Sequence, residues 1–124
     1  MKKISDIYAI KIIFFITASY VGLWSIRIPT IKDQLLTDYI GIGYIMLTFA
    51  LGSIFAMILA NSLILKTSTK TILTFTLLAE GLLWLPVPFI PDLWIFMIFS
   101  FVFGMSYGAF EIACNVYALS LIHI

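Results

Sequence analysis

The chain has 124 residues, of which 63% are hydrophobic and 10% charged, and its mean hydropathy is +1.16. Soluble domains are about 45–50% apolar and about 25% charged, so this composition excludes an ordinary soluble domain. The chain has seven Lys and Arg residues and six Asp and Glu residues, which gives a net charge of +1. This balance leaves no basic surface for nucleic acid, so we expect a lipid bilayer as partner and no nucleic acid.

Charged residues divide the chain into four apolar segments. Each is long enough, or nearly so, to cross a hydrocarbon core of about 30 Å as a helix. We therefore predict an all-α polytopic membrane protein with four transmembrane helices in a single region, covering residues 7–28, 40–63, 71–90 and 93–121.

The 71–90 segment carries Glu80 near its middle and Pro86 and Pro88 near its end. The prolines predict a kinked helix with a distorted last turn. The links between segments are short, which favours an antiparallel up-and-down bundle.

Orientation follows from the Lys and Arg residues in the short flanks. Lys2, Lys3, Lys11, Lys66 and Lys70 lie on one predicted side, and Arg27 and Lys32 lie on the other. We predict a multi-pass protein of the plasma membrane, the inner membrane of a bacterium, with both termini cytoplasmic.

One face of the 93–121 segment combines small and polar residues. Gly104, Gly108, Glu111 and Asn115 fall within an arc of roughly 60° at helical spacing. The two glycines form a GxxxG pattern, which allows close helix packing and is frequent in apolar segments. We interpret the glycines as packing residues. A charged acid inside a bilayer costs at least ~2.5 kcal/mol, so Glu111 and Asn115 are our candidate functional pair.

In this pair, Glu111 suits the uptake and release of a proton, and the Asn115 amide suits the hydroxyl groups of a polar solute. Glu80 is a possible second acid, with Thr76 one turn earlier on the same face. The alternative for Glu80 is a protonated carboxyl that is bonded between helices.

Other features of the sequence indicate helix packing more than a functional site. Gly52 begins a four-residue spacing of small residues in the 40–63 segment, which indicates helix packing. Four aromatic residues suit stacking on a sugar or drug ring, although an aromatic belt and helix packing are the favoured reading: Tyr20, Trp24, Tyr107 and Tyr117. We find no metal-ligand spacing, nucleophile elbow or phosphate loop, so we expect no enzyme, metal or cofactor.

Three segments resemble the first four helices of a major facilitator superfamily transporter, in particular the fucose-permease-like group. They are Arg27–Asp33, the pair Gly52-Ser53, and Gly108–Asn115, which has the group's Gly-x-x-acid-x-x-x-Asn spacing. The resemblance implies that the first and fourth helices line a central cavity. It also implies that Glu111 is the acid of proton-coupled uptake and that Asn115 is its polar neighbour.

By this resemblance we expect secondary transport of a small polar solute, sugar-like or another metabolite, by alternating access. The chain departs from the pattern at Ser25, where the group has an acid. Only Lys66 and Lys70 remain of the superfamily's cytoplasmic loop motif, since its Gly, Asp and Gly places hold Asn61, Leu65 and Ser68.

Superfamily transporters are built from three-helix repeats around a midplane site, and four helices make one repeat and a piece of the next. The end of the chain, Leu119–Ile124, is similar to translated sequencing-adapter read-through. We therefore expect an incomplete amino-terminal half whose partners are the missing transporter helices or further copies of itself.

Two other classes stay open. One is a four-helix small multidrug-resistance transporter that works as a dimer, although such proteins place their essential acid in the first helix. The other is a membrane remnant without transport activity. Substitution of Glu111 by Gln distinguishes these classes in a flux assay.

Overall fold

The computed structural model describes the backbone of residues 2–123, and all side chains except those of residues 1–3, 61, 64–65 and 120–124. The elements are α1 (Lys2–Gln34), α2 (Tyr39–Lys66), α3 (Thr69–Leu83), the 3-10 turn η1 (Val87–Phe89) and α4 (Leu93–His123). Four helical stretches, counting α3 with η1, are long and apolar enough to cross a membrane, and the described residues contain no strand. The prediction of an all-α polytopic membrane protein is confirmed.

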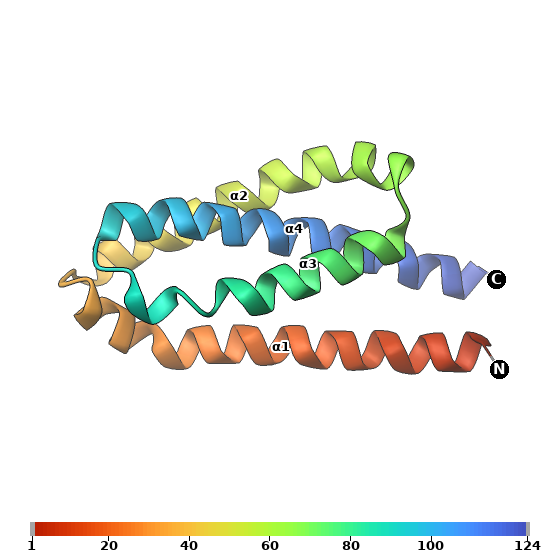
Figure 1. Cartoon of the computed structure of the whole chain (residues 1–124), viewed down its shortest axis with the longest axis horizontal. Helices are drawn as coiled ribbons and strands as arrows, with labels where there is room; N and C mark the ends of the chain where they lie inside the picture. Colours follow the sequence, from red (N-terminus) through yellow and green to blue (C-terminus); the bar gives the residue numbers. More distant parts are fainter. Residues whose placement is uncertain (1, 124) are drawn as a thin grey trace.

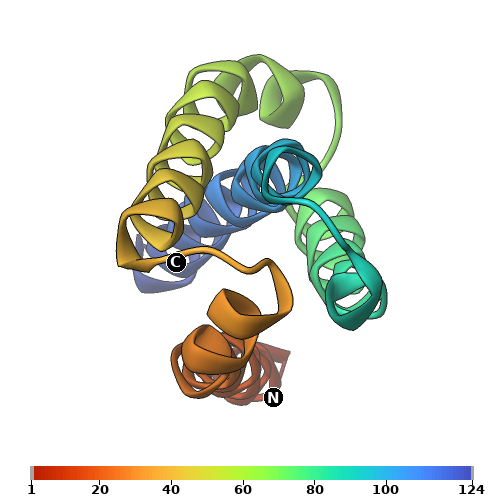
Figure 2. The same cartoon turned by 90° about the vertical axis from the view of Figure 1, so that its left-hand side faces the viewer.

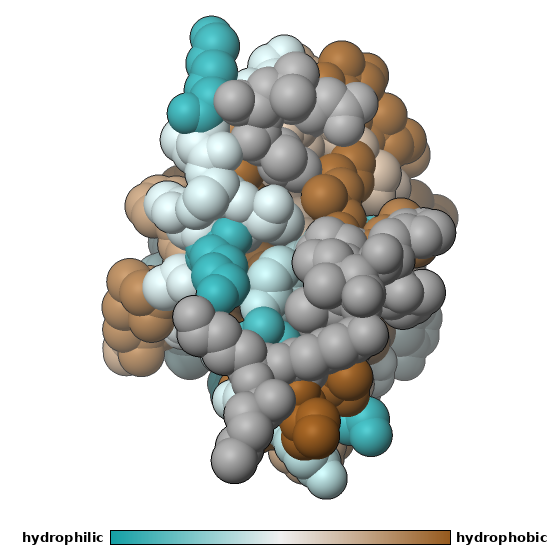
Figure 3. All heavy atoms as spheres, turned by 90° about the vertical axis from the view of Figure 1, so that its right-hand side faces the viewer, coloured by the Kyte–Doolittle hydropathy of each residue, from teal (hydrophilic) through white to brown (hydrophobic). Residues whose placement is uncertain are grey.

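The four helices run up and down in alternation, with both termini at one end of the bundle (Figure 1). Viewed along the bundle, α4 lies between α2 and α3, and α1 lies at the edge (Figure 2). Hydrophilic residues lie on the end that carries the termini, with hydrophobic residues along the flanks (Figure 3). This distribution suits a bundle whose sides contact lipid and whose terminal end contacts water.

The seam between α2 and α4 is the closest helix pairing in the fold. A Cβ atom added at Gly52, Gly104 or Gly108 would collide with the main-chain carbonyl of Phe101, Phe49 or Ser53, respectively. The Ser53 hydroxyl donates a hydrogen bond of 3.0 Å across this seam to the Gly104 carbonyl. Absence of side chains at these glycines therefore lets the two backbones approach, and a hydroxyl then links them.

The first helix is longer than predicted, because α1 continues through Pro29 to Gln34 instead of ending near residue 28. The turn beyond Pro29 buries Ile31 and Leu35, which are 1% and 7% exposed, in a hydrophobic cluster with residues of α2 and α4. Burial of these side chains offsets the main-chain hydrogen bond that the proline lacks.

The third helix is shorter than predicted: α3 ends at Leu83, and the chain reaches residue 90 through η1. The amide N–H groups of Trp84 and Leu85 bond the carbonyls three residues earlier, which tightens the last turn. Pro86 has no N–H and disfavours helical backbone at the residue before it, so the helix stops here rather than kinking.

A side chain of α1 supports this corner. The Gln34 amide nitrogen donates to the carbonyls of Val87, at 2.9 Å, and Ile90, at 2.6 Å. These bonds join the far end of α1 to η1. The other predicted spans agree with α2 and α4 to within three residues at each end. Asn61, Leu65 and the residues beyond Leu119 were singled out in the sequence, but their side chains lie outside the described part of the structure.

Candidate functional site

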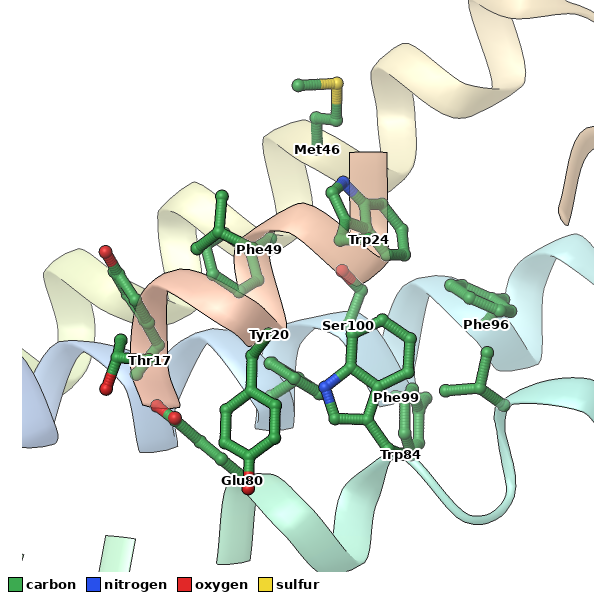
Figure 4. Close-up of a pocket in the computed structure, with 14 residues that line it drawn as sticks. Thr17, Tyr20, Trp24, Met46, Phe49, Glu80, Trp84, Phe96, Phe99 and Ser100 are labelled. Carbon is green, nitrogen blue, oxygen red and sulfur yellow. The ribbon is translucent and has the colours of Figure 1, made fainter. Parts of the chain in front are cut away.

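A cavity of about 270 Å³ lies between the four helices and extends from the middle of the bundle toward the end away from the termini. Figure 4 shows the side chains that line it. Side chains from α1, α2, α3, η1 and α4 form its wall. They are Thr17, Tyr20, Val21, Trp24, Met46, Phe49, Glu80, Trp84, Val87, Phe96, Phe99, Ser100, Phe103 and Tyr107. Most of them are aromatic or aliphatic, so the cavity is apolar apart from a few groups at defined positions.

Glu80 is the charged residue of this wall. Its side chain extends from α3 into the space between the helices (Figure 4), and the residue is 1% exposed. Neither carboxylate oxygen has a hydrogen-bond partner, and the indole N–H of Trp84, four residues later at the C-cap of α3, lacks a partner as well. A buried carboxyl normally has a partner, because its desolvation is costly. The cavity therefore presents an acceptor and a donor that both lack their usual contacts.

Four hydroxyl groups line the cavity, and those of Thr17 and Ser100 are already engaged, whereas those of Tyr20 and Tyr107 are not. Thr17 donates to the Ile13 carbonyl at 3.0 Å, and Ser100 donates to the Ile45 carbonyl of α2 at 3.0 Å. Each of these two hydroxyls therefore uses its proton on the main chain. The Glu80 carboxyl stays the strongest hydrogen-bonding group that faces the cavity without a protein partner.

Aromatic rings line the cavity in contacting pairs. Trp84 meets Phe103 edge to face, with ring centroids 5.8 Å apart, and Trp24 lies 6.2 Å from Phe96. Phe49 packs against Tyr107 at 5.5 Å. Such contacts hold the rings in place, so the aromatic wall is formed before any solute enters.

Glu111 lies in a different place. It is partly exposed and lines a second, more open hollow of about 330 Å³ between α1 and α4, together with Phe14, Thr17, Ala18, Val21, Tyr107, Phe110 and Cys114. Thr17, Val21 and Tyr107 line both spaces. The two acids therefore occupy adjoining spaces that share these three side chains.

The structure does not bring Asn115 into either space, and its side chain is exposed. The sequence places Glu111 and Asn115 on the glycine face of α4, but α2 diverges from α4 toward the terminal end of the bundle (Figure 1). The face of α4 that packs on α2 at Gly104 and Gly108 is therefore no longer covered by α2 at Asn115.

The two lysines of the connection between α2 and α3 are exposed. Lys70 lies with its ammonium 5.8 Å from the ring centroid of Tyr117 on α4, and Lys66 ends α2. Both lie at the end of the bundle that carries the termini. Among the side chains that the structure describes, no three of His, Cys, Asp or Glu lie close enough together to hold a metal ion.

Sequence reasoning missed Trp84 and Ser100 as members of the site. It also favoured belt and packing roles for aromatic residues of which three, Tyr20, Trp24 and Tyr107, line the central cavity. A signal was present: Thr76, Glu80 and Trp84 follow one another at four-residue spacing, which places them on one side of α3 and its C-cap. Spacing identifies a common face, but it does not reveal which other helix that face meets.

Comparisons of the chain with models of protein families, with curated proteins and with solved structures find no match. The functional argument therefore rests on the site itself.

Proposed function

We propose that this protein is part of a membrane transporter whose solute site is the central cavity. The observation that carries the proposal is Glu80, a carboxyl 1% exposed and without a hydrogen-bond partner, which faces a cavity among four membrane-spanning helices. Acids inside membrane segments are costly and mark solute or proton pathways. Sites at the middle of a helical bundle are typical of secondary transporters.

The proposed mechanism is alternating access of the major facilitator type, supported by the sequence resemblance described above. In this scheme Glu80 contacts the solute, and Glu111 in the adjoining hollow exchanges the coupling proton. The α1 helix contacts α2 and α4 over short stretches only. It is the element most easily displaced to open the cavity. Further transporter helices, or a second copy of the chain, cover the open side of α1 in the complete assembly.

We also propose a bacterial inner membrane location with both termini cytoplasmic. Lys66 and Lys70 lie at the same end of the bundle as both termini (Figure 1), as the positive-inside rule requires of a cytoplasmic end. The test is labelling of cysteines in intact cells with a membrane-impermeant maleimide. Ser68→Cys should be protected and Asp92→Cys labelled, against a low background because Cys114 is buried. The reverse pattern would invert the orientation.

The transport proposal is tested by flux into proteoliposomes that contain the chain. Uptake of labelled solutes, with a hexose, an amino acid and a small amine as probes, is measured with and without an inward proton gradient. Glu80→Gln should lower exchange of the transported probe by about tenfold or more, equivalent to about 1.4 kcal/mol of lost interaction. Glu111→Gln should leave exchange in place and remove its dependence on the gradient.

Two outcomes would contradict the proposal. One is the absence of both flux and saturable binding of every probe with the folded wild-type chain, which would favour a membrane remnant. The other is unchanged exchange in Glu80→Gln, which would remove the central cavity from the solute path. Circular dichroism and gel filtration of each variant provide the control for folding.

A further inference from the structure

We infer that the central cavity selects a small organic cation, with one ammonium group on a flat aromatic or similarly apolar body. This inference rests on the proposed function, because it assigns a chemical class to the solute of that same cavity. It differs from the sugar-like solute that the sequence resemblance implies. Its basis is the combination of one unpaired acid with an otherwise apolar, aromatic wall.

The first step concerns charge. Both oxygens of Glu80 are buried without a hydrogen-bond donor. A carboxylate in such surroundings needs a proton or a cation, and an ammonium group supplies charge and hydrogen-bond donors together. No Lys, Arg or His lines the cavity in the described part of the chain. The compensating charge must therefore come from the solute or from the proton that it displaces.

The second step concerns the walls. Trp24, Trp84 and Tyr20 surround the same space as Glu80 and come from two helices (Figure 4). A cation over an aromatic face gains electrostatic attraction, which is larger when water is excluded. The rings also offer flat apolar surfaces to an aromatic body. Both parts of the inferred solute therefore have a complementary surface.

The third step concerns what the cavity lacks. A sugar presents several hydroxyl groups, and each needs a partner once it leaves water. Here the hydroxyl protons of Thr17 and Ser100 are already donated to main-chain carbonyls. The further donors on the wall are the Trp84 indole N–H, which has no partner, and the hydroxyls of Tyr20 and Tyr107. A wall with one acid and these few donors, otherwise apolar, satisfies a single ammonium group better than a ring of hydroxyls.

The fourth step concerns size. The cavity of about 270 Å³ is at the lower limit of small-molecule sites, which span about 300–1,000 Å³. It therefore suits a solute with one ring and a short amine arm. The probe that we choose is 2-phenylethylammonium. Its neutral counterpart, 2-phenylethanol, has the same ring and chain but no charge.

The experiment measures equilibrium binding of labelled 2-phenylethylammonium to the wild-type chain in phosphatidylcholine nanodiscs at pH 7, with empty nanodiscs subtracted. Unlabelled 2-phenylethanol and a hexose serve as competitors. We expect saturable binding, and competition by the alcohol that is weaker than competition by the unlabelled amine by at least about tenfold. This comparison uses wild-type protein alone, so it does not depend on the folding of a variant.

Two variants locate the interaction. Glu80→Gln should weaken cation binding by at least about tenfold while leaving binding of the alcohol within about twofold. Asp33→Asn removes one negative charge at an exposed position outside the cavity and should leave both affinities unchanged. Equal losses in both variants would mean that overall charge, and not the cavity, attracts the amine.

The failures of the two proposals are distinguishable. Equal binding of the amine and the alcohol, or stronger competition by the hexose, would overturn the cation inference while leaving the cavity as a solute site. Absence of saturable binding for all three probes, together with absence of flux, would overturn the proposed function as well.

Discussion

The seam between α2 and α4 and the cavity beside α1 are built in opposite ways. In the seam, the glycines have no side chains, so the main chains of α2 and α4 lie very close together. The Ser53 hydroxyl donates a hydrogen bond across the seam to the Gly104 carbonyl. Around the cavity, large rings keep the helices apart, and Glu80 and Trp84 keep polar atoms without partners. The seam satisfies its polar groups, and the cavity leaves those of Glu80 and Trp84 unsatisfied.

This difference indicates that the seam and the cavity have different roles. A membrane helix pair gains stability from close packing and interhelical hydrogen bonds. An unpaired buried carboxyl costs stability, and our proposal assigns this one a role in binding. We therefore expect substitutions in the seam to reduce stability, and substitutions at the cavity to change binding with little loss of stability.

The largest expected effect is on the seam. Gly104→Ala places a Cβ against the Phe49 carbonyl, which belongs to rigid main chain. We expect a loss of about 3 kcal/mol in the free energy of unfolding, at the upper end of the usual cost of overpacking. Denaturation in mixed micelles, followed by circular dichroism, measures it.

The matched control is Gly43→Ala on α2, where an added Cβ meets no atom within 4 Å. This substitution should stabilise the helix by up to about 1 kcal/mol, because alanine has the higher helix propensity. If both variants lose similar stability, the seam is not the tight contact that the structure describes.

The next largest effect is expected at the cavity, where the substitution should raise the free energy of unfolding rather than lower it. Glu80→Met replaces a buried, unpartnered carboxyl with an apolar side chain of similar length. We expect the free energy of unfolding to rise by about 1–3 kcal/mol, the usual cost of an unsatisfied buried polar group. Amine binding should be lost in the same variant.

Glu111→Met is the comparison for that variant, since Glu111 is partly exposed. Its stability should change less than that of Glu80→Met. A clear loss of stability in Glu80→Met would mean that the carboxyl has a structural partner, and the contrast between seam and cavity would fail.

A smaller effect tests how α1 is held at the far end of the cavity. Gln34→Ala removes the two hydrogen bonds to the carbonyls of Val87 and Ile90. We expect a loss of about 1–2 kcal/mol, from two bonds of ordinary strength. Amide hydrogen exchange at Val87, Phe89 and Ile90 should speed up in this variant. Unchanged exchange would show that the corner does not depend on α1.

The smallest effect returns to the seam. Ser53→Ala removes the hydroxyl that bonds the Gly104 carbonyl but keeps the close approach of the helices. Interhelical hydrogen bonds in membranes contribute about 0.6 kcal/mol on average, so we expect a loss of this size in the same unfolding assay. A loss as large as that of Gly104→Ala would assign the stability of the seam to its hydrogen bond rather than to packing.

Much of the fold was predictable because the solvent imposes it. A helix must span the hydrocarbon core to satisfy its own main chain, so long uncharged runs locate the spans directly. The ends were harder to predict. The first helix was expected to end near residue 28, but α1 continues through Pro29, and Ile31 and Leu35 beyond it are buried. Pro86 ends α3 where a kink was expected.

The candidate site was predictable in its residue types but not in its arrangement. Glu80 and Glu111 stand out in any reading, because an acid in an apolar run is rare. Sequence reasoning ranked Glu111 and Asn115 first, whereas the structure encloses Glu80 most fully and leaves Asn115 exposed. Helical spacing shows which residues share a face, and it carries no information on how far the neighbouring helix follows that face.

The sequence by itself therefore determined that this protein lies in a lipid bilayer, where its four spans are and that they alternate in direction. These features depend on local hydropathy and on short connections. Only the tertiary structure decided which acid faces the cavity and which aromatic rings enclose it. Those features depend on the crossing of α2 and α4 and on the place where they diverge, and contacts between residues distant in the chain set both.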